Sequence, residues 1–361
     1  MNIFEKIANL FKKRYKALPE ATTYNEKAKD KSWILKGNMD SQQETKLDQD
    51  IGRFLESYYS LMEQIDTTYP IDERQLPRAY DALVRMNAEP VTRDEYSNNL
   101  FEENELLQEV YGQNRYNIDM QKNRAGRNVF YHIRSKGYQL PPDNEIIRIY
   151  VNCNNANIAE LSKTILECNQ NNNFYLKLSP NEENAINPRG EKIVIYCKEN
   201  EFEYNMELLQ YVKSIKPELF NGSEKTLPFL KNEDNIASVA RQPLTNQYYD
   251  LYNRNRTIPQ SHNTFLANIL QDSYMETTRE IARNDSNLSF LLDEQYENSR
   301  LWYVKNYLYI NENYHDYLLK SMEAKMDMLS RKNNIYIDGL NYNNQYDRET
   351  GQTQELYEER Y

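Results

Sequence analysis

The chain has 361 residues, 39% of them hydrophobic and 27% charged, with a formal net charge of −11. This length suits one large or two smaller domains, and the acidic balance argues against a general nucleic-acid binder, which normally carries a basic surface. The chain contains no glycine-rich phosphate loop, its cysteines and histidines lack disulfide or zinc spacing, and no apolar run approaches the ~20 residues of a membrane span. We therefore expect a cytoplasmic protein without a metal or organic cofactor.

Residues 1–48 predict an amphipathic helix followed by a polar linker. In MNIFEKIANLFKKRYKAL the apolar residues recur at helical spacing, and several Lys and Arg residues make the segment basic. Such a helix can lie on a membrane surface, dock on a partner or pack on its own domain, and we favour the last of these. It lacks the continuous apolar stretch of a signal peptide.

Residues 49–130 are predicted to be a helical region. Between 49 and 64 the apolar residues follow a 3.6-residue period. Pro77 suits the first turn of a second helix, PRAYDALVRM. Residues 91–145 have a less regular pattern, in which YHIRSKGYQL is a candidate hairpin arm.

Residues 131–334 predict an α+β domain with a helical C-terminal part. The order from 146 to 216 is strand, helix, strand, strand, helix, in IIRIYVNC, NIAELSKTILECN, FYLKLS, EKIVIYC and EYNMELLQYVKSIK. This order predicts a central, mostly antiparallel sheet flanked by helices. From 236 to 334 we expect mainly helix, and the polar residues 335–361 are expected to form a flexible tail.

Side chains alternate between the two faces of a strand, and each predicted strand has one wholly apolar face. The apolar set is Ile147, Ile149, Val151, Cys153, Phe174, Leu176, Leu178, Ile193, Ile195 and Cys197. The polar members of the opposite faces are Arg148, Tyr150, Asn152, Tyr175, Lys177, Lys192 and Tyr196. That second set is aromatic and cationic and contains no carboxylate, so it suits an anionic ligand. A solvated surface remains the alternative interpretation.

The stretch from IRIYVNC to KENEFE resembles the core of the Hop-A type III effector family of plant-pathogenic bacteria. The residues that carry the resemblance are Arg148, Tyr150, Asn152, Phe174, Lys177, Arg189 and Tyr196, followed by TLPFLKNEDNIASVA and SYMETTREI. Relatives of that family occur in lanthipeptide and thioamidated-peptide gene clusters, where they are associated with making dehydroamino acids. The resemblance covers about residues 130–285.

The chain departs from the family pattern at several positions. Glu191 stands where the family usually has an aspartate, Met275 replaces a glycine, and Arg279 is offset. The lysine–arginine spacing is also similar to that of effector phosphothreonine lyases of the SpvC and OspF type, which use a lysine base and a histidine acid. Tyr150 stands where that histidine would fall.

These resemblances imply phosphate elimination from a phosphorylated Ser or Thr. Lys177 would be the base, with a pKa lowered by burial and neighbouring cations, and Arg189 would grip the phosphate. Tyr150 or His132 would supply the acid. Lys192, Arg148 and Arg241 are further candidate phosphate ligands, with Arg254 and Arg256 behind them.

The sequence thus favours a carbon–oxygen lyase that eliminates phosphate from a phosphorylated precursor peptide, which a kinase encoded nearby would supply. No nucleic acid is expected as a partner. A non-catalytic effector-like or peptide-binding protein is the alternative from another class, and a phage or plasmid structural protein is a third.

Overall fold

A computed structural model describes residues 45–338 with short gaps, together with two short strands further on. The gaps are 63–77, 87, 89–91, 125, 141, 143–144, 187–188, 221–226, 287, 295–299 and 301–311. The predicted N-terminal helix and all but the end of its linker therefore lie outside the described residues.

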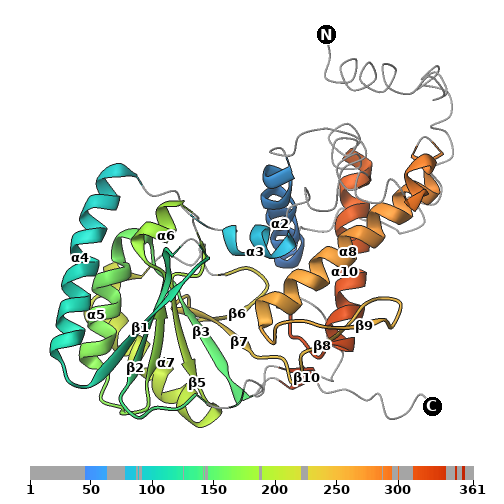
Figure 1. Ribbon diagram of the computed structural model, residues 1–361. Helices are drawn as coiled ribbons and strands as arrows, with labels where there is room; N and C mark the ends of the chain where they lie inside the picture. The colour runs from blue at the N-terminus through green and yellow to red at the C-terminus, as the bar shows by residue number, and fades with distance from the viewer. Residues whose placement is uncertain are drawn as a thin grey trace. The chain divides into compact units, whose positions relative to one another are not determined.

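A seven-stranded sheet lies at the centre of the described region, and every neighbouring pair in it is antiparallel (Figure 1). The spatial order is β1-β2-β4-β5-β3-β7-β6. The strands are β1 (Tyr116–Lys122), β2 (Asn128–Ser135), β3 (Ile147–Val151), β4 (Tyr175–Leu178), β5 (Ile193–Cys197), β6 (Lys231–Glu233) and β7 (Ala237–Arg241). This sheet confirms the α+β prediction and the three strands expected between 146 and 197.

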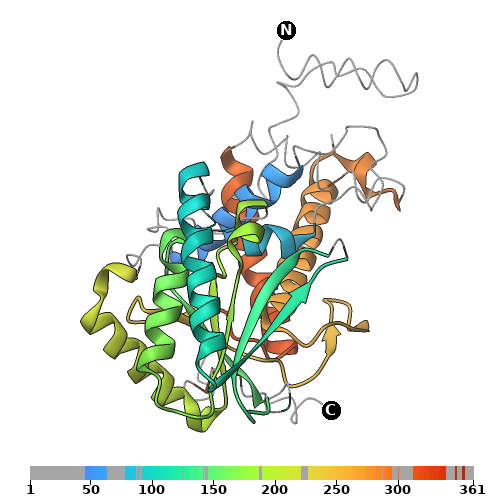
Figure 2. The ribbon, with the colours of Figure 1, turned by 60° about the vertical axis from the view of Figure 1, so that its left-hand side comes forward.

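Three helices cover one face of the sheet (Figure 2). They are α4 (Arg93–Gly112), α5 (Ile158–Cys168) and α7 (Glu199–Ile215). Their apolar residues form one core with the side chains that alternation assigned to the apolar face, such as Ile149, Leu176 and Ile195, each 0% exposed. The main core is therefore where the strand pattern placed it.

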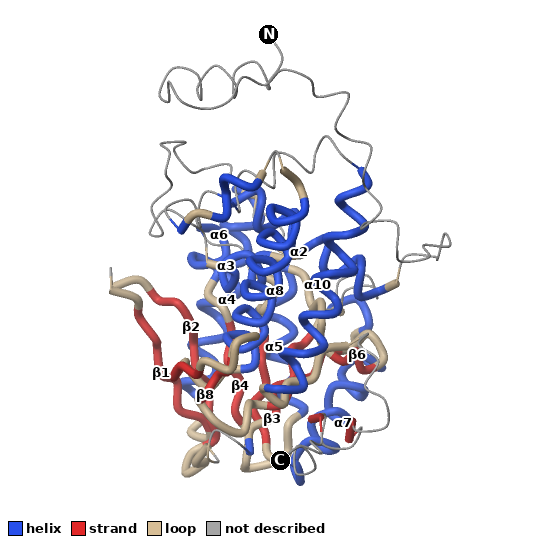
Figure 3. Tube along the Cα trace, turned by 90° about the vertical axis from the view of Figure 1, so that its right-hand side faces the viewer, coloured by secondary structure: helices blue, strands red, loops and turns tan. Residues whose placement is uncertain are grey.

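A second group of helices packs together (Figure 3), on the side of the sheet away from α4 and α5 (Figure 1). It consists of α2 (Lys46–Met62), α3 (Ala79–Arg85), α8 (His262–Asn284) and α10 (Glu312–Lys332). Lys320 of α10 bonds to Asp48 of α2 at 3.0 Å, and Lys325 of α10 bonds to Glu280 of α8 at 2.6 Å. Asp50 of α2 accepts a hydrogen bond at 3.0 Å from the amide of Phe229, which stands two residues before β6.

Several elements depart from the sequence expectation. The region after 236, expected to be mainly helix, begins with β7 in the central sheet and a hairpin of β8 (Gln247–Tyr249) and β9 (Asn255–Thr257). These strands have three to five residues, too short to show a clear alternation. Helix α4 lies in the stretch 49–130 that was predicted to be helical, and a capping box marks its start: Thr92 and Glu95 bond to each other's backbone amides. Strand β1 lies in the same stretch and departs from that prediction. A short helix, α6 (Asn181–Ile186), follows β4.

The segment expected as a tail begins in packed structure. The Ile335 amide bonds to the Ser330 carbonyl at 2.8 Å, and the Asp338 amide bonds to the Phe229 carbonyl at 2.9 Å. Further on, β10 (Tyr346–Asp347) pairs with β11 (Gln352–Thr353), and the rest of 335–361 lies outside the described residues. None of the described helices combines the length and the apolar character needed to cross a membrane.

Candidate functional site

The face of the sheet opposite α4, α5 and α7 is also buried, and it is aromatic and charged. Its buried cluster contains Tyr138, Ile146, Tyr150, Tyr175, Val194, Tyr196, Leu230 and Ala240. The rings of Tyr175 and Tyr196 stack with centroids 4.7 Å apart, and the guanidinium of Arg148 lies 5.2 Å from the Tyr196 centroid. Alternation had assigned Tyr150, Tyr175 and Tyr196 to one face, and they lie together here, on a face that is buried rather than solvated.

Lys177 of β4 lies among these residues as a half-buried amine. Its Nζ is 3.5 Å from the centroid of the Phe130 ring. Burial lowers the pKa of Lys177 to about 8, with Arg148 and Arg189 lowering it further and Glu191 opposing them. At pH 7 about one tenth of the side chains are then neutral, against roughly one in three thousand for an ordinary lysine.

Arg148 and Tyr150 are neighbours on the same face of β3. The Arg148 Nε and the Tyr150 hydroxyl are both buried, and neither makes a hydrogen bond of standard geometry within the described structure. The two side chains are nevertheless close enough to attract each other. Burial raises the pKa of Tyr150 well above its usual range, and the charge of Arg148 offsets only part of that rise. Tyr150 therefore remains protonated at neutral pH.

Arg189 reaches the same place from the loop between α6 and β5. Its guanidinium lies 5.2 Å from the Phe130 centroid, and its buried Nε has no hydrogen-bond partner among the described residues. Gly190 fixes this loop: its amide bonds to the Val84 carbonyl at 2.9 Å, and a Cβ on it would stand 2.6 Å from the Met86 carbonyl oxygen. A side chain at Gly190 would thus push the loop, and Arg189 with it, away from α3.

A buried carboxylate, Glu191, belongs to the cluster and corrects the expectation that this face carries no acid. Glu191 is 5% exposed and accepts a hydrogen bond from Asn263 near the start of α8. Its charge acts on the pKa of Lys177, Arg148 and Tyr80. Strand alternation did not include Glu191, because β5 begins only at Ile193 and Glu191 stands in the preceding loop.

His132 of β2 lies directly opposite Lys177 in the β2–β4 register. Its Nδ1 is 2.5 Å from the Tyr175 hydroxyl and its Nε2 is 3.0 Å from Gln121 Oε1. Burial lowers the pKa of His132 to about 4, and the charge of Lys177 adds to that effect. His132 is therefore neutral at pH 7, with a tautomer in which Nε2 donates to Gln121 and Nδ1 accepts from Tyr175.

A second histidine lies near this cluster at the start of α8. His262 is buried, and its Nε2 has no hydrogen-bond partner in the described structure. Burial lowers the pKa of His262 to about 4, a hydrogen bond with the Arg241 backbone opposes this, and the charge of Arg148 adds to it.

Two residues of the predicted set lie elsewhere. Lys192 is buried and donates from Nζ to the Cys153 carbonyl at 3.0 Å. Arg241, at the end of β7, forms an ion pair with Glu199, the first residue of α7. Neither is among the groups whose charge acts on Lys177. The structure thus brings together Lys177, Arg148, Tyr150, Arg189 and His132, which with Glu191 are called the cationic cluster below.

Sequence reasoning missed several residues that reach the cluster from elements other than β3, β4 and β5. Tyr80 comes from α3, Phe130 from the start of β2, and His262 and Asn263 from α8. Only Phe130 had a local signal, because it is two residues from His132 and so shares its face of the strand. Among the described residues, no three His, Cys, Asp or Glu side chains gather as a metal-binding set.

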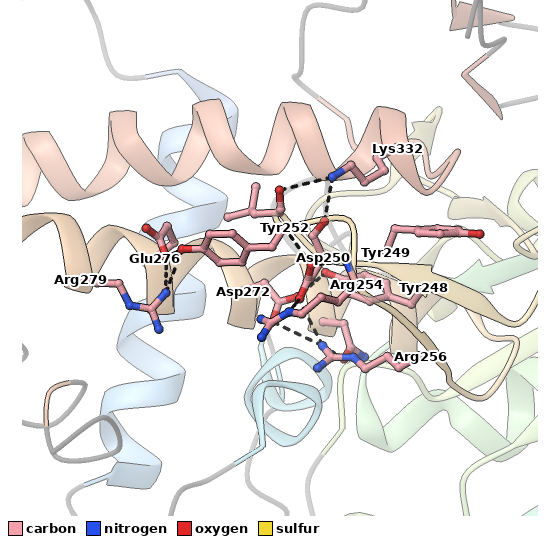
Figure 4. A network of polar contacts seen from close by, with 12 residues as sticks. Tyr248, Tyr249, Asp250, Tyr252, Arg254, Arg256, Asp272, Glu276, Arg279 and Lys332 are labelled. Carbon is pink, nitrogen blue, oxygen red and sulfur yellow. Dashed lines mark hydrogen bonds and ion pairs between the residues drawn. The ribbon is translucent and has the colours of Figure 1, made fainter. Parts of the chain in front are cut away.

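A second group of charged and tyrosine residues lies around the β8–β9 hairpin (Figure 4). It consists of Tyr248, Tyr249, Asp250, Tyr252, Arg254, Arg256, Asp272, Glu276, Arg279 and Lys332, and is called the hairpin network below. Asp250 accepts from the Tyr252 amide at 2.8 Å and from Arg254 Nε at 2.6 Å, and Lys332 of α10 donates to the Asp250 carbonyl at 2.8 Å. Arg254 and Arg256, ranked last as phosphate ligands, belong to this network and are paired with Asp250 and Asp272.

No protein-family model matches the chain, and no curated protein matches it. Two solved structures are similar to it at a low level. One is an effector protein from Pseudomonas syringae pv. tomato strain DC3000, with a TM-score of 0.39 and 13% identity, covering 62% of this chain and 88% of that one. The other is an effector protein from Pseudomonas syringae pv. syringae strain 61, with a TM-score of 0.37 and 14% identity, covering 63% and 89%.

Proposed function

We propose that the cationic cluster binds the phosphate group of a phosphoserine or phosphothreonine peptide and eliminates it as a carbon–oxygen lyase. One observation carries the proposal: a lysine whose pKa is lowered to about 8 stands beside two arginines whose buried Nε atoms have no hydrogen-bond partner among the described residues. Buried donors are normally satisfied, so unpaired ones that gather in one place point to a missing acceptor. A phosphate oxygen is the acceptor that guanidinium groups match best.

The charges of the cluster fit a phosphate monoester. Lys177, Arg148 and Arg189 supply three positive charges and Glu191 one negative charge, so an excess of positive charge remains whether Lys177 is protonated or neutral. A phosphate monoester has a second pKa of about 6 and is mostly dianionic at neutral pH. Its binding would offset this excess.

The elimination follows from the protonation states. The neutral Lys177 amine takes the Cα proton, and the C–H electron pair forms the Cα=Cβ bond as the Cβ–O bond breaks. The electrons of that bond go to the phosphate oxygen, which Arg148 and Arg189 stabilise as its charge grows. The products are a dehydroamino acid and inorganic phosphate.

Tyr150 suits the acid role better than His132. Tyr150 is protonated at neutral pH, and the neighbouring Arg148 opposes the rise that burial causes in its pKa and so makes Tyr150 a better proton donor. His132, with a pKa lowered to about 4, is protonated in only about one molecule in a thousand at pH 7. We assign Tyr150 as the proton donor to the leaving oxygen and His132 to orienting Tyr175 next to the cluster.

Mass spectrometry of a phosphothreonine peptide after incubation with the protein tests the proposal. A lyase removes H₃PO₄ and leaves dehydrobutyrine, whereas a phosphatase leaves threonine. We expect the dehydro product with the wild type and none with Lys177→Ala. Lys163→Ala is the matched control, because Lys163 lies on α5 in an exposed ion pair with Glu109, and it should leave the rate unchanged.

Equal product formation by the wild type and Lys177→Ala would overturn the role of Lys177. Binding of the peptide without any mass change, at every pH tested, would overturn the elimination and favour a phosphopeptide-binding protein instead.

A further inference from the structure

Phe130 makes contacts that the proposed reaction does not explain. The Lys177 ammonium lies 3.5 Å from the centroid of its ring, and the Arg189 guanidinium lies 5.2 Å from the same centroid. Both distances fall within the ~6 Å range of attraction between a cation and an aromatic ring. One buried ring therefore holds both the candidate base and a candidate phosphate ligand.

The register of the sheet explains how Phe130 reaches Lys177. His132 is paired with Lys177, and Phe130 is two residues before His132 on the same face of β2. Its Cβ is thus a diagonal neighbour of Lys177, close enough for an aromatic ring to make contact. On the other side, Phe130 is paired with Gln121 of β1, whose side chain holds His132.

The ring acts on Lys177 together with the charges around it. His132 faces Lys177 from β2, Arg148 from β3, and Arg189 and Glu191 from the loop before β5. Burial, Arg148 and Arg189 favour the neutral amine, while Glu191 favours the ammonium. The π face of Phe130 also favours the ammonium, so the ring acts in the same direction as Glu191.

We propose that Phe130 is a positioning residue that holds the Lys177 amine and the Arg189 guanidinium against one aromatic ring. Phe130 thereby fixes the distance between the base and this phosphate-binding guanidinium. This inference deepens the proposed function and rests on it for its catalytic meaning. The placement itself can be measured without substrate.

The test compares Phe130→Leu, which removes the π face, with Phe130→Tyr, which keeps it. The rate at which an acylating reagent modifies Lys177 is followed against pH by peptide mass spectrometry, which gives the pKa of that amine directly. We expect Phe130→Leu to lower the pKa of Lys177 by about half to one and a half units and Phe130→Tyr to keep it. Phe101→Leu on α4, where the ring is 64% exposed and far along the chain from the cluster, is the matched control and should change nothing.

An unchanged Lys177 pKa in Phe130→Leu overturns the proposal. If that variant does not fold by circular dichroism, Phe130→Met, which fills the space with a flexible apolar chain, is measured in its place and is expected to give the same downward shift. In the lyase assay, the acidic limb of the pH–rate profile of Phe130→Leu should move to lower pH by the same amount as the pKa of Lys177. A wild type that is inactive at every pH while the Lys177 shift is present would overturn the proposed function alone.

Discussion

The cationic cluster and the hairpin network use the same kinds of side chain in opposite ways. In the hairpin network each arginine meets a carboxylate, as Arg254 meets Asp250 and Arg279 meets Glu276. In the cationic cluster no described residue accepts a hydrogen bond from the Nε atom of Arg148 or Arg189, and Lys177 faces an aromatic ring. The first arrangement joins a hairpin to two helices, and the second leaves donors free for an anion.

This difference separates stability from function. Paired charges with several hydrogen bonds hold elements together, and removing one partner leaves the other unsatisfied. Buried cations with unused hydrogen-bond donors cost stability and persist where a ligand uses them. Substitutions in the two regions should therefore change the free energy of unfolding with opposite signs.

The largest effect on stability is expected in the hairpin network. Asp250→Ala removes the acceptor of the Tyr252 amide, the Arg254 amide and Arg254 Nε. It should lower the free energy of unfolding by about 1–3 kcal/mol, because the donors lose their partner. Urea denaturation followed by circular dichroism measures this, and a loss below about 0.5 kcal/mol would contradict the structural role of the network.

Lys177→Met should act in the opposite direction. Because burial lowers the pKa of Lys177 to about 8, the folded state binds fewer protons than the unfolded state between that value and the ordinary lysine pKa, and wild-type stability rises with pH across this window. At pH 7 the wild type bears the full cost of the buried charge. Replacing that charge with an apolar side chain of similar length should then raise the free energy of unfolding by about 1–2 kcal/mol.

The same denaturation series at several pH values provides the check. The difference in the free energy of unfolding between Lys177→Met and the wild type should shrink as the pH rises from about 8 toward the pKa of an ordinary lysine. A variant less stable than the wild type at pH 7 would mean that Lys177 stabilises the fold through Phe130 and Glu191 by more than its burial costs.

The smallest effects concern the balance of charge around Lys177. Arg189→Met removes a neighbour that lowers the pKa of Lys177, so that pKa should rise, whereas Glu191→Gln removes a neighbour that raises it, so the pKa should fall. Each shift is expected to be about half a unit. The acylation profile of Lys177 measures both, and shifts of the same sign would show that the charges do not act as assigned.

The sequence predicted β3, β4 and β5, three of the seven strands, and alternation sorted their side chains onto two faces. It also found Lys177, Arg148 and Tyr150, which alternation places on one face. It could not place Lys192 and Glu191, because they stand in the loop before β5 where the period fails. Nor could it find Tyr80, His262 and Asn263, because tertiary packing of α3 and α8 brings them to the sheet.

We propose that the cationic cluster keeps the Nε donors of Arg148 and Arg189 available for a phosphate group. The most direct test is calorimetric titration of the Lys177→Met variant, which should bind the substrate without turning it over. The variant is titrated with a phosphothreonine peptide and, separately, with the same peptide carrying threonine. We predict that binding requires the phosphate. Adding Arg148→Met or Arg189→Met to the Lys177→Met variant should weaken binding at least about tenfold. Adding Arg254→Met, in the hairpin network, should leave the affinity unchanged. Equal affinities for the two peptides, or an equal loss with Arg254→Met, would contradict this proposal.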